Sequence, residues 1–427
     1  MTTAPAGSDN TGPEDAGRPP ATSVLAEAGA DLESVTSLVQ SLVRTPSRGG
    51  IDHYGEVVEV VTGWFSDHGL PCRRLYDNAG GDVVGIVCDV TGIQPGPRYV
   101  LDACLDTAPF GDPVAWRHPP TSGTVEDGWL YGRGAADSKA AIAIFAHIAA
   151  RIRHEAGRLR GSLTLLFDAD EHTGRFGGAK RYFRGPDAPE DVAGVMIGYP
   201  GSEHLIVGGR GFLRAELTVR GRPGHTGSKR SAQNAVEKAA QLVLSLREHE
   251  TPAAVDDKLA LAPCLTVTRI AGGESYSIVP DHCVIGIDIR LTTTFDESAA
   301  KAVVQHVVRL VDEQWPATEK TAIAYDETWP AFVLGATSAV RAALTLSASR
   351  YLPGFVGPKV AGPSNIGNFL AQLGIDATAG LGVRYEGLHG TDERIELSTM
   401  PAVQATYHDA LLRLLRDNAD AVPQPQR

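Results

Sequence analysis

Acids, histidines and a cysteine stand just after several apolar runs of the sequence. They fall in the segments 104–107, 132–139, 168–172 and 387–393, and Tyr199 follows a further run. In open α/β sheets ligands bind at the carboxyl ends of the strands, so we expect these side chains to gather at one rim. Carboxylates, imidazoles and a thiol at one place could hold a divalent metal ion, transfer protons or attack a substrate. The sequence therefore predicts a site for small-molecule chemistry.

Each of these groups also has a structural explanation when it is taken alone. An aspartate after a strand, such as Asp106 or Asp137, is commonly a turn former or a helix N-cap. Cys104 alone would be a small buried apolar residue, and His172 and His389 would be ordinary hydrogen-bonded histidines. The functional interpretation is favoured because such groups recur at the ends of successive strands.

Apolar strands alternate with amphipathic helices over most of the chain. The runs DVVGIVCDV, RYVLDACL, SLTLLFD and AGVMIGY are typical of strands, and apolar residues at helical spacing follow Asp137. From about residue 211 the order becomes strand, helix, strand, strand, helix, strand, which is a βαββαβ unit of the ferredoxin-like kind. We therefore predict an α/β fold with a mixed, largely parallel catalytic sheet and an inserted ferredoxin-like domain.

These patterns also predict the domain boundaries. The first 24 residues carry four prolines, three glycines and no aromatic residue, a composition that is typical of disorder. We expect a disordered leader at 1–24 and a catalytic domain in two parts, at 25–208 and 326–415. An inserted dimerisation or lid domain is expected at 209–325, and a loose tail at 416–427.

Composition excludes several classes of partner. There are 39 Lys plus Arg against 51 Asp plus Glu, a net charge of -12, which argues against nucleic acid. No window holds the roughly 18 consecutive apolar residues of a membrane span, and no apolar run near the start suits a signal peptide. The segment GRGAADSK lacks the order of a phosphate loop, and the five cysteines form no CxxC pair. We expect a cytoplasmic protein with reduced cysteines and no membrane partner.

Several motifs together resemble one enzyme family. The motifs L-D-T-x-P, W-x-x-P-P, L-Y-G-R-G-x-x-D-x-K, D-E-x-x-G and G-R-P-G-H-T-G are similar to those of the zinc-dependent family of aminoacylases, acetylornithine deacetylase, succinyl-diaminopimelate desuccinylase and glutamate carboxypeptidase. The resemblance covers about residues 30–415 and implies a two-metal hydrolase. It implies that Asp137 bridges the metals, His389 is a ligand, Glu171 is the general base and Asp106 orients the first histidine ligand.

Three ligand positions depart from the family pattern. Cys104 stands at the first histidine, His172 at the second of the paired glutamates, and Tyr199 at the acid after the next strand. Asp137, His172 and His389 would still suit zinc or another divalent ion with an open position. The companion site would keep Cys104, Asp137 and a phenol, which is a poor ligand at neutral pH. We expect one divalent ion per subunit, with zinc as the first candidate, rather than two. Because Cys104 replaces the first histidine, the orienting role of Asp106 is left open.

The inserted domain matches the family in part. The resemblance implies that His225 reaches the substrate of a partner subunit, in a homodimer, and that Arg290 binds the substrate carboxylate. Pairing with Asp288 on the surface is the alternative for Arg290. Ser277 stands where the family usually has an asparagine near that carboxylate.

The leading hypothesis is a metal-dependent hydrolase that cleaves an amide bond of an N-acyl amino acid or small peptide with a free carboxylate. Glu171 would take a proton from the attacking water and pass it to the leaving amine. One alternative is a non-hydrolytic reaction, acyl transfer or cyclisation, with Cys104 as nucleophile and His389 or His172 as its base. The other is a catalytically inactive binding protein.

Overall fold

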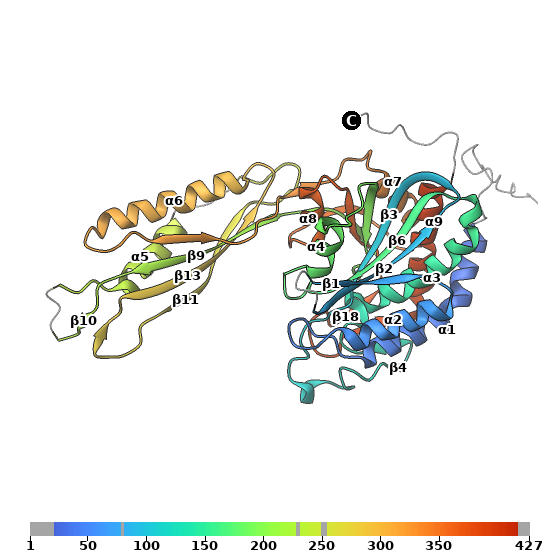
Figure 1. The fold of residues 1–427 in the computed structure, drawn as a ribbon, viewed down its shortest axis with the longest axis horizontal. Coiled ribbons are helices and arrows are strands. Elements are labelled where there is room, and N and C mark those ends of the chain that lie inside the picture. Colours follow the sequence, from blue (N-terminus) through green and yellow to red (C-terminus); the bar gives the residue numbers. More distant parts are fainter. Residues whose placement is uncertain (1–20, 78–80, 228–230, 249–253, 417–427) are drawn as a thin grey trace, which may run out of the picture. The chain divides into compact units, whose positions relative to one another are not determined.

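The computed structural model of the protein describes residues 21–77, 81–227, 231–248 and 254–416 (Figure 1). Most of the expected leader and tail lies outside the described residues. Helix α1 begins at Ala21, so residues 21–24, which we assigned to the leader, are helical.

The chain forms two compact units. The first unit comprises Met1–Leu205, Ala336–Pro358 and Asp376–Arg427, and the second comprises Ile206–Gly335 and Lys359–Ile375. The domain boundaries expected from the sequence stay a prediction, which limited proteolysis could test.

A mixed sheet forms the centre of the first unit. Its strands lie in the order β1-β2-β6-β3-β7-β17, with β6, β3, β7 and β17 parallel and β1 and β2 antiparallel at one edge. Their bounds are Cys72–Tyr76 (β1), Val83–Thr91 (β2), Gln94–Cys104 (β3), Arg160–Asp168 (β6), Val192–Ile197 (β7) and Ala377–Gly380 (β17). The mixed sheet that we predicted is confirmed.

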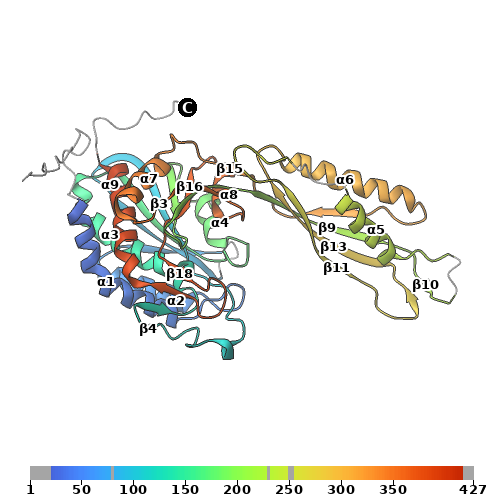
Figure 2. The ribbon, with the colours of Figure 1, turned by 180° about the vertical axis from the view of Figure 1, so that it is seen from behind.

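Helices cover both faces of this sheet. Phe65 of α2 stacks on Phe167 of β6 with ring centroids 5.9 Å apart, whereas Gly178 of α4 packs against Asp168, the next residue of β6. Adjacent strand residues point to opposite faces, so α2 and α4 lie on opposite faces. Helix α9 packs against α1, α3 and α7 (Figure 2). The helices are Ala21–Arg44 (α1), Gly55–Asp67 (α2), Ala140–Glu155 (α3), Gly177–Arg184 (α4), Ala339–Tyr351 (α7) and Met400–Leu415 (α9).

A small antiparallel sheet joins two distant parts of the first unit. Its order is β18-β19-β5-β4, with bounds Tyr385–Glu386 (β18), Arg394–Glu396 (β19), Trp129–Tyr131 (β5) and Thr124–Glu126 (β4). Because β19 pairs with β5, the loop before β19 lies beside the turn after β5. Two of the segments expected to carry the chemistry therefore meet here.

The second unit contains the predicted βαββαβ arrangement. Its sheet has the order β11-β13-β9-β14, and α5 and α6 pack on it around one apolar core (Figure 1). The bounds are Gly211–Arg220 (β9), Ala235–Glu248 (α5), Cys264–Gly272 (β11), His282–Leu291 (β13), Glu297–Gln314 (α6) and Ala322–Tyr325 (β14). The ferredoxin-like order of elements is confirmed.

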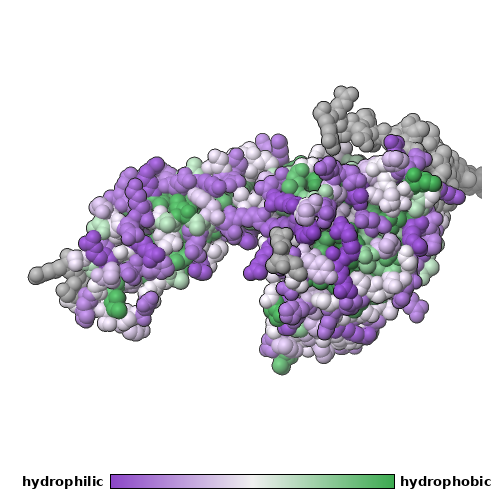
Figure 3. All heavy atoms as spheres, viewed as in Figure 1, coloured by the Kyte–Doolittle hydropathy of each residue, from purple (hydrophilic) through white to green (hydrophobic). Residues whose placement is uncertain are grey.

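Shorter elements complete the chain. They are His204–Gly209 (β8), Gly224–His225 (β10), Ile278–Val279 (β12), Phe332–Val333 (β15), Gly357–Ala361 (β16) and Ile366–Gln372 (α8), with short helical turns at Pro113–Ala115, Ala135–Lys139, Ala156–Arg158 and Leu397–Thr399. Among the described residues, no helix combines the length and the apolar character needed to cross a membrane. On the face drawn in Figure 3, apolar residues form only small separate areas.

Candidate metal centre and active site

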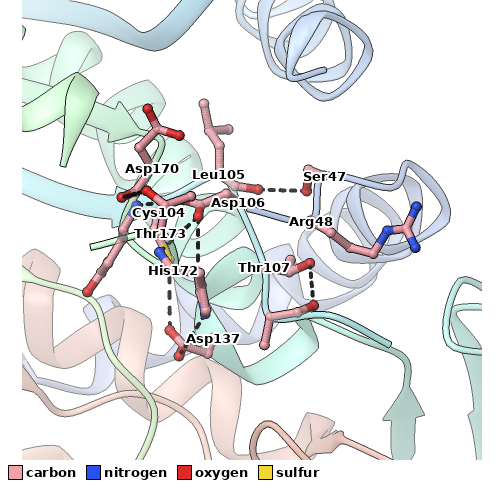
Figure 4. A network of polar contacts seen from close by, with 12 residues as sticks. Ser47, Arg48, Cys104, Leu105, Asp106, Thr107, Asp137, Asp170, His172 and Thr173 are labelled. Carbon is pink, nitrogen blue, oxygen red and sulfur yellow. Dashed lines mark hydrogen bonds and ion pairs between the residues drawn. The ribbon is translucent and has the colours of Figure 1, made fainter. Parts of the chain in front are cut away.

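The carboxyl ends of β3, β6 and β7 bring the candidate residues of the first unit together. Cys104, the last residue of β3, is in register with Asp168 at the end of β6, and β7 lies on the other side of β3. Asp106, His172 and Tyr199 follow these three strands, so their side chains start from one rim. Figure 4 shows Asp106 and His172 close together with Asp137 nearby.

Two imidazoles converge on the carboxylate of Asp137. The Oδ2 atom of Asp137 lies 2.9 Å from Nε2 of His389 and 3.5 Å from Nε2 of His172. The two imidazole rings lie 5.3 Å apart, edge to face. Asp137 belongs to the turn before α3, His172 to the loop after β6, and His389 to the loop before β19. Three separate segments thus supply one cluster.

The charges of this cluster favour a cation. Burial opposes the imidazolium of His172, but Asp106 and Asp137 outweigh it and raise the pKa of His172 to about 10. Burial likewise opposes the carboxylate of Asp137, but the two histidines hold its pKa below the ordinary value. The ligand atoms of Asp137, His172 and His389 all lie within 4.8 Å of one another. Two imidazole nitrogens and a carboxylate oxygen fit a divalent ion that keeps an open position.

A second group shares His172. Cys104, Asp106 and His172 also place one ligand atom each within 4.8 Å of one another. The Sγ atom of Cys104 lies 3.2 Å from Oγ of Ser138 and 3.8 Å from Oδ1 of Asp137. Burial, and next the charge of Glu171, raises the pKa of the Cys104 thiol well above its ordinary value. The thiol is therefore protonated in the metal-free protein.

Glu171 lies next to the cluster with Tyr199 as its partner. The hydroxyl of Tyr199 donates a hydrogen bond to Oε1 of Glu171. Burial, and next the charge of Asp137, raises the pKa of Glu171 well above its ordinary value. The carboxyl group of Glu171 can therefore accept and release a proton beside the cluster.

A buried ion pair that the sequence did not reveal connects the ligand segments. Arg133 and Glu393 are 2% and 0% exposed. Arg133 also donates to the backbone carbonyls of His389 and Gly390, at 3.1 and 2.9 Å, while Glu393 accepts the amide hydrogen of Ala136 at 3.0 Å. Both residues stand close to expected ligands in the sequence, within the segments 132–139 and 387–393. This closeness in sequence could have marked them as part of the site.

Lys139 ties the same turn to the first helix. The side chain is 1% exposed, and Nζ donates to the carbonyls of Leu42 and Thr45, at 2.8 and 3.0 Å. Burial lowers the pKa of Lys139 to about 7. Because Leu42 lies in the last turn of α1, the lysine satisfies a carbonyl that has no partner within the helix.

The remaining candidates belong to the second unit. His225 is exposed on β10, and its Nδ1 accepts the amide hydrogen of Gly227. Arg290 is half-buried; its Nε lies 2.7 Å from Oδ1 of Asp288, and Nη1 donates to Ser364 at 3.2 Å. The pairing of Arg290 with Asp288 that we considered is present. Ser277 accepts the amide hydrogen of Thr226 through its carbonyl.

The fold and the cluster together define a class of protein. An α/β sheet that carries two imidazoles and a carboxylate beside a buried glutamate is typical of a metal-dependent hydrolase. The chain belongs to Peptidase family M20/M25/M40, whose sequence profile matches residues 100–413. The resemblance inferred from the motifs is confirmed.

Individual relatives agree with this assignment. The chain is 28% identical over 339 residues to a succinyl-diaminopimelate desuccinylase of Marinobacter nauticus, covering 75% of this chain and 84% of the relative. It is also 28% identical over 302 residues to the enzyme of that name from Rhodospirillum centenum, covering 67% and 75%. A tripeptidase of Staphylococcus aureus shares the fold, with a TM-score of 0.69 at 18% identity over 89% of this chain and 97% of that one. The dipeptidase Dug1p of Saccharomyces cerevisiae gives 0.68 at 13% identity over 92% and 98%.

The family assignment decides between the hypotheses drawn from the sequence. The protein is a metal-dependent enzyme that hydrolyses amide bonds, and the non-hydrolytic and inactive alternatives are not favoured. Members of the family use divalent metal ions.

Proposed function

We propose that the protein hydrolyses N-acyl amino acids or short peptides with a free carboxylate, using one divalent ion held by Asp137, His172 and His389. The observation that carries this proposal is the convergence of both Nε2 atoms on Oδ2 of Asp137. A bound ion would lower the pKa of water and polarise the scissile carbonyl. Zinc is the first candidate for a site of two imidazoles and one carboxylate.

Glu171 is the proposed general base and acid. Its carboxyl group stands one residue from His172 and is not part of either group of ligand atoms. A raised pKa matches a group that must accept a proton from water and return it to the leaving amine near neutral pH. Tyr199, whose hydroxyl reaches Glu171, is proposed to contact the substrate beside it.

Cys104 is proposed to be neither nucleophile nor ligand. Nucleophilic attack and metal ligation both require the thiolate. Burial of Cys104, which is 1% exposed, disfavours that form, and its thiol contacts the hydroxyl of Ser138. A single ion per subunit follows if the thiol stays protonated.

Two observations support the proposed substrate class: the names of the relatives and the guanidinium of Arg290. The similar desuccinylases remove a succinyl group by name, and the structural neighbours include a tripeptidase and a dipeptidase. Arg290 supplies a guanidinium that could bind a substrate carboxylate, with Asp288 and Ser364 holding it. N-acyl amino acids and peptides share the free carboxylate that such a group recognises.

Pairing of two chains is proposed to occur through the second unit. Strand β11 stands at one edge of its sheet and is largely exposed along its nine residues. A long exposed edge strand presents unpaired backbone groups with which another chain can pair. In such a homodimer His225 would be offered to the substrate of the partner subunit.

Two measurements test the proposed function. Metal analysis of protein purified without added metal should find about one equivalent of zinc or another divalent ion per chain. A screen of N-acetyl and N-succinyl amino acids, dipeptides and tripeptides, followed by release of free amine, should find a substrate whose turnover stops on chelation. Two tightly bound equivalents, or turnover that survives complete removal of metal, would overturn the single-ion proposal.

A further inference from the structure

Asp106 contacts His172 at two points. Its Oδ2 accepts the amide hydrogen of His172 at 2.9 Å and lies 3.4 Å from Nδ1 of the ring (Figure 4). Its Oδ1 accepts the amide hydrogen of Glu171 at 3.1 Å. Asp106 is completely buried, and Nδ1 of His172 is also out of contact with solvent and makes no hydrogen bond at this separation. The carboxylate therefore faces both the backbone and the ring of the histidine.

Close packing holds these two residues together. A Cβ atom at Gly49 would lie 2.9 Å from Oδ2 of Asp106 and 3.1 Å from Cβ of His172. The backbone of Gly49 is held in turn by its hydrogen bond to the carbonyl of Thr107. The absence of a side chain at position 49 lets the backbone approach the carboxylate of Asp106 and the Cβ atom of His172 at once.

We infer that Asp106 is a positioning residue for His172, and that this chain has moved the oriented imidazole from position 104 to position 172. A hydrogen on Nδ1 turned toward Asp106, 3.4 Å away, would give this buried nitrogen a partner and leave Nε2 facing Asp137, where the ion of the proposed function would bind. Carboxylates that hold the second nitrogen of a ligating histidine fix both its tautomer and its orientation. With the imidazole at position 172, Asp106 still has a histidine to orient, although Cys104 stands at the position where the resemblance implies that histidine.

The geometry contains one competing arrangement. Cys104, Asp106 and Nδ1 of His172 could together hold a soft cation, in which case Nδ1 would be a ligand rather than a donor. Both oxygens of Asp106 already accept backbone amide hydrogens, which suits an orienting role. The two arrangements differ in whether sulfur binds the ion, so they can be separated by experiment.

The first test measures zinc affinity by competition with a chelator. Asp106→Asn should weaken zinc binding about 10- to 100-fold, because an amide nitrogen placed near the ring no longer accepts its hydrogen. Asp168→Asn is the matched control, since Asp168 is equally buried and its raised pKa makes the protonated acid a close analogue of asparagine. The control should bind zinc as the unaltered protein does.

A double-mutant cycle separates positioning from a general loss of structure. If Asp106 acts through the imidazole, Asp106→Asn should cost little further affinity in a His172→Ala background, where direct titration with zinc measures the weaker binding that gel filtration does not preserve. Gly49→Ala should weaken binding without changing a charge, whereas Gly55→Ala, where an added Cβ meets no atom within 4 Å, should not. Equal losses from Asp106→Asn in both backgrounds would overturn the positioning role.

Cobalt substitution identifies the ligand atoms. The spectrum of the Co²⁺-loaded protein should lack a sulfur-to-cobalt charge-transfer band and should be the same in Cys104→Ser. A band that disappears in Cys104→Ser would overturn the inference in favour of the soft-cation arrangement. Absence of any bound equivalent in the unaltered protein would overturn the proposed function as well, whereas equal losses in the cycle leave that function intact.

Discussion

Arg133 and Glu393 form an ion pair of 2.5 Å that joins positions 260 residues apart, with both side chains almost completely buried. The pair holds the loop of His389, whose backbone has a φ of 58° in the left-handed region. Such a conformation persists in a non-glycine residue when its surroundings fix it. The hydrogen bonds from Arg133 to the carbonyls of His389 and Gly390 supply that support.

Glu393→Gln should therefore destabilise the protein and weaken metal binding together. Removing one partner of a buried pair leaves an uncompensated charge and commonly costs about 3–5 kcal/mol. The exposed pair of Arg384 with Glu396 provides the control, since Arg384→Gln should cost roughly 0–1 kcal/mol. Denaturant unfolding and chelator competition measure both effects. Similar small changes in the two variants would contradict the role given to Glu393.

Metal content should depend on His172 and not on Cys104. His172→Ala removes one of three proposed ligands, whereas Cys104→Ala removes a protonated thiol. Elemental analysis after gel filtration should find the ion lost from the first variant and retained in the second. Loss from Cys104→Ala with retention in His172→Ala would reverse the assignment of ligands.

Glu171→Gln should turn over slowly and still bind the ion. The substitution keeps the shape of the side chain and removes the proton acceptor, and general-base catalysis contributes roughly 10²- to 10⁴-fold. Rate and metal content should be measured on the same preparation. Near-normal turnover would place the base elsewhere.

His408 should make the protein sensitive to acid. Burial lowers the pKa of His408 from 6.5 to about 4, so the unfolded chain binds the proton more readily than the folded one. Stability should thus fall as the pH drops from 6.5 to 4, by roughly 3 kcal/mol from this residue alone. Unfolding of metal-free His408→Gln should lack this part of the slope, while exposed His53→Gln should keep it. Parallel slopes in the two variants would rule out His408 as the source.

A mixed dimer tests whether the active site is shared. Chains with Glu171→Gln lack the proposed base, and chains with His225→Ala lack a histidine that we propose donates a hydrogen bond to the oxyanion of the intermediate, a loss that costs about 10²- to 10³-fold. In a heterodimer one site would have both residues intact, so part of the activity should return. Verified heterodimers without activity, or a monomer by light scattering, would refute the shared site.

The gathering of candidate residues at the carboxyl ends of the strands could be predicted, because it depends only on the direction and order of the strands. Cys104 and Asp168 end adjacent parallel strands, and neither placement depends on a side-chain conformation. The small sheet that includes β5 and β19 was missed, since strands of two or three residues are too short to show a periodic pattern.

The partner of Asp106 could not be predicted for a different reason. The sequence shows an imidazole at position 172 and none at 104, but the approach of His172 to Asp106 involves close packing of both residues against Gly49, more than 100 residues earlier. Side-chain direction is set by neighbours in space, which periodicity does not report.

The hydrogen bonds of Lys139 to the end of α1 have a consequence for how the protein unfolds. Because the lysine lies two residues from Asp137, fraying of the last turn of α1 would loosen the backbone that carries a proposed ligand. Binding of an ion to the folded form alone stabilises that form by mass action. The amide hydrogens at the end of the first helix should accordingly exchange more slowly with solvent as the metal concentration rises, although no residue of that helix is a ligand.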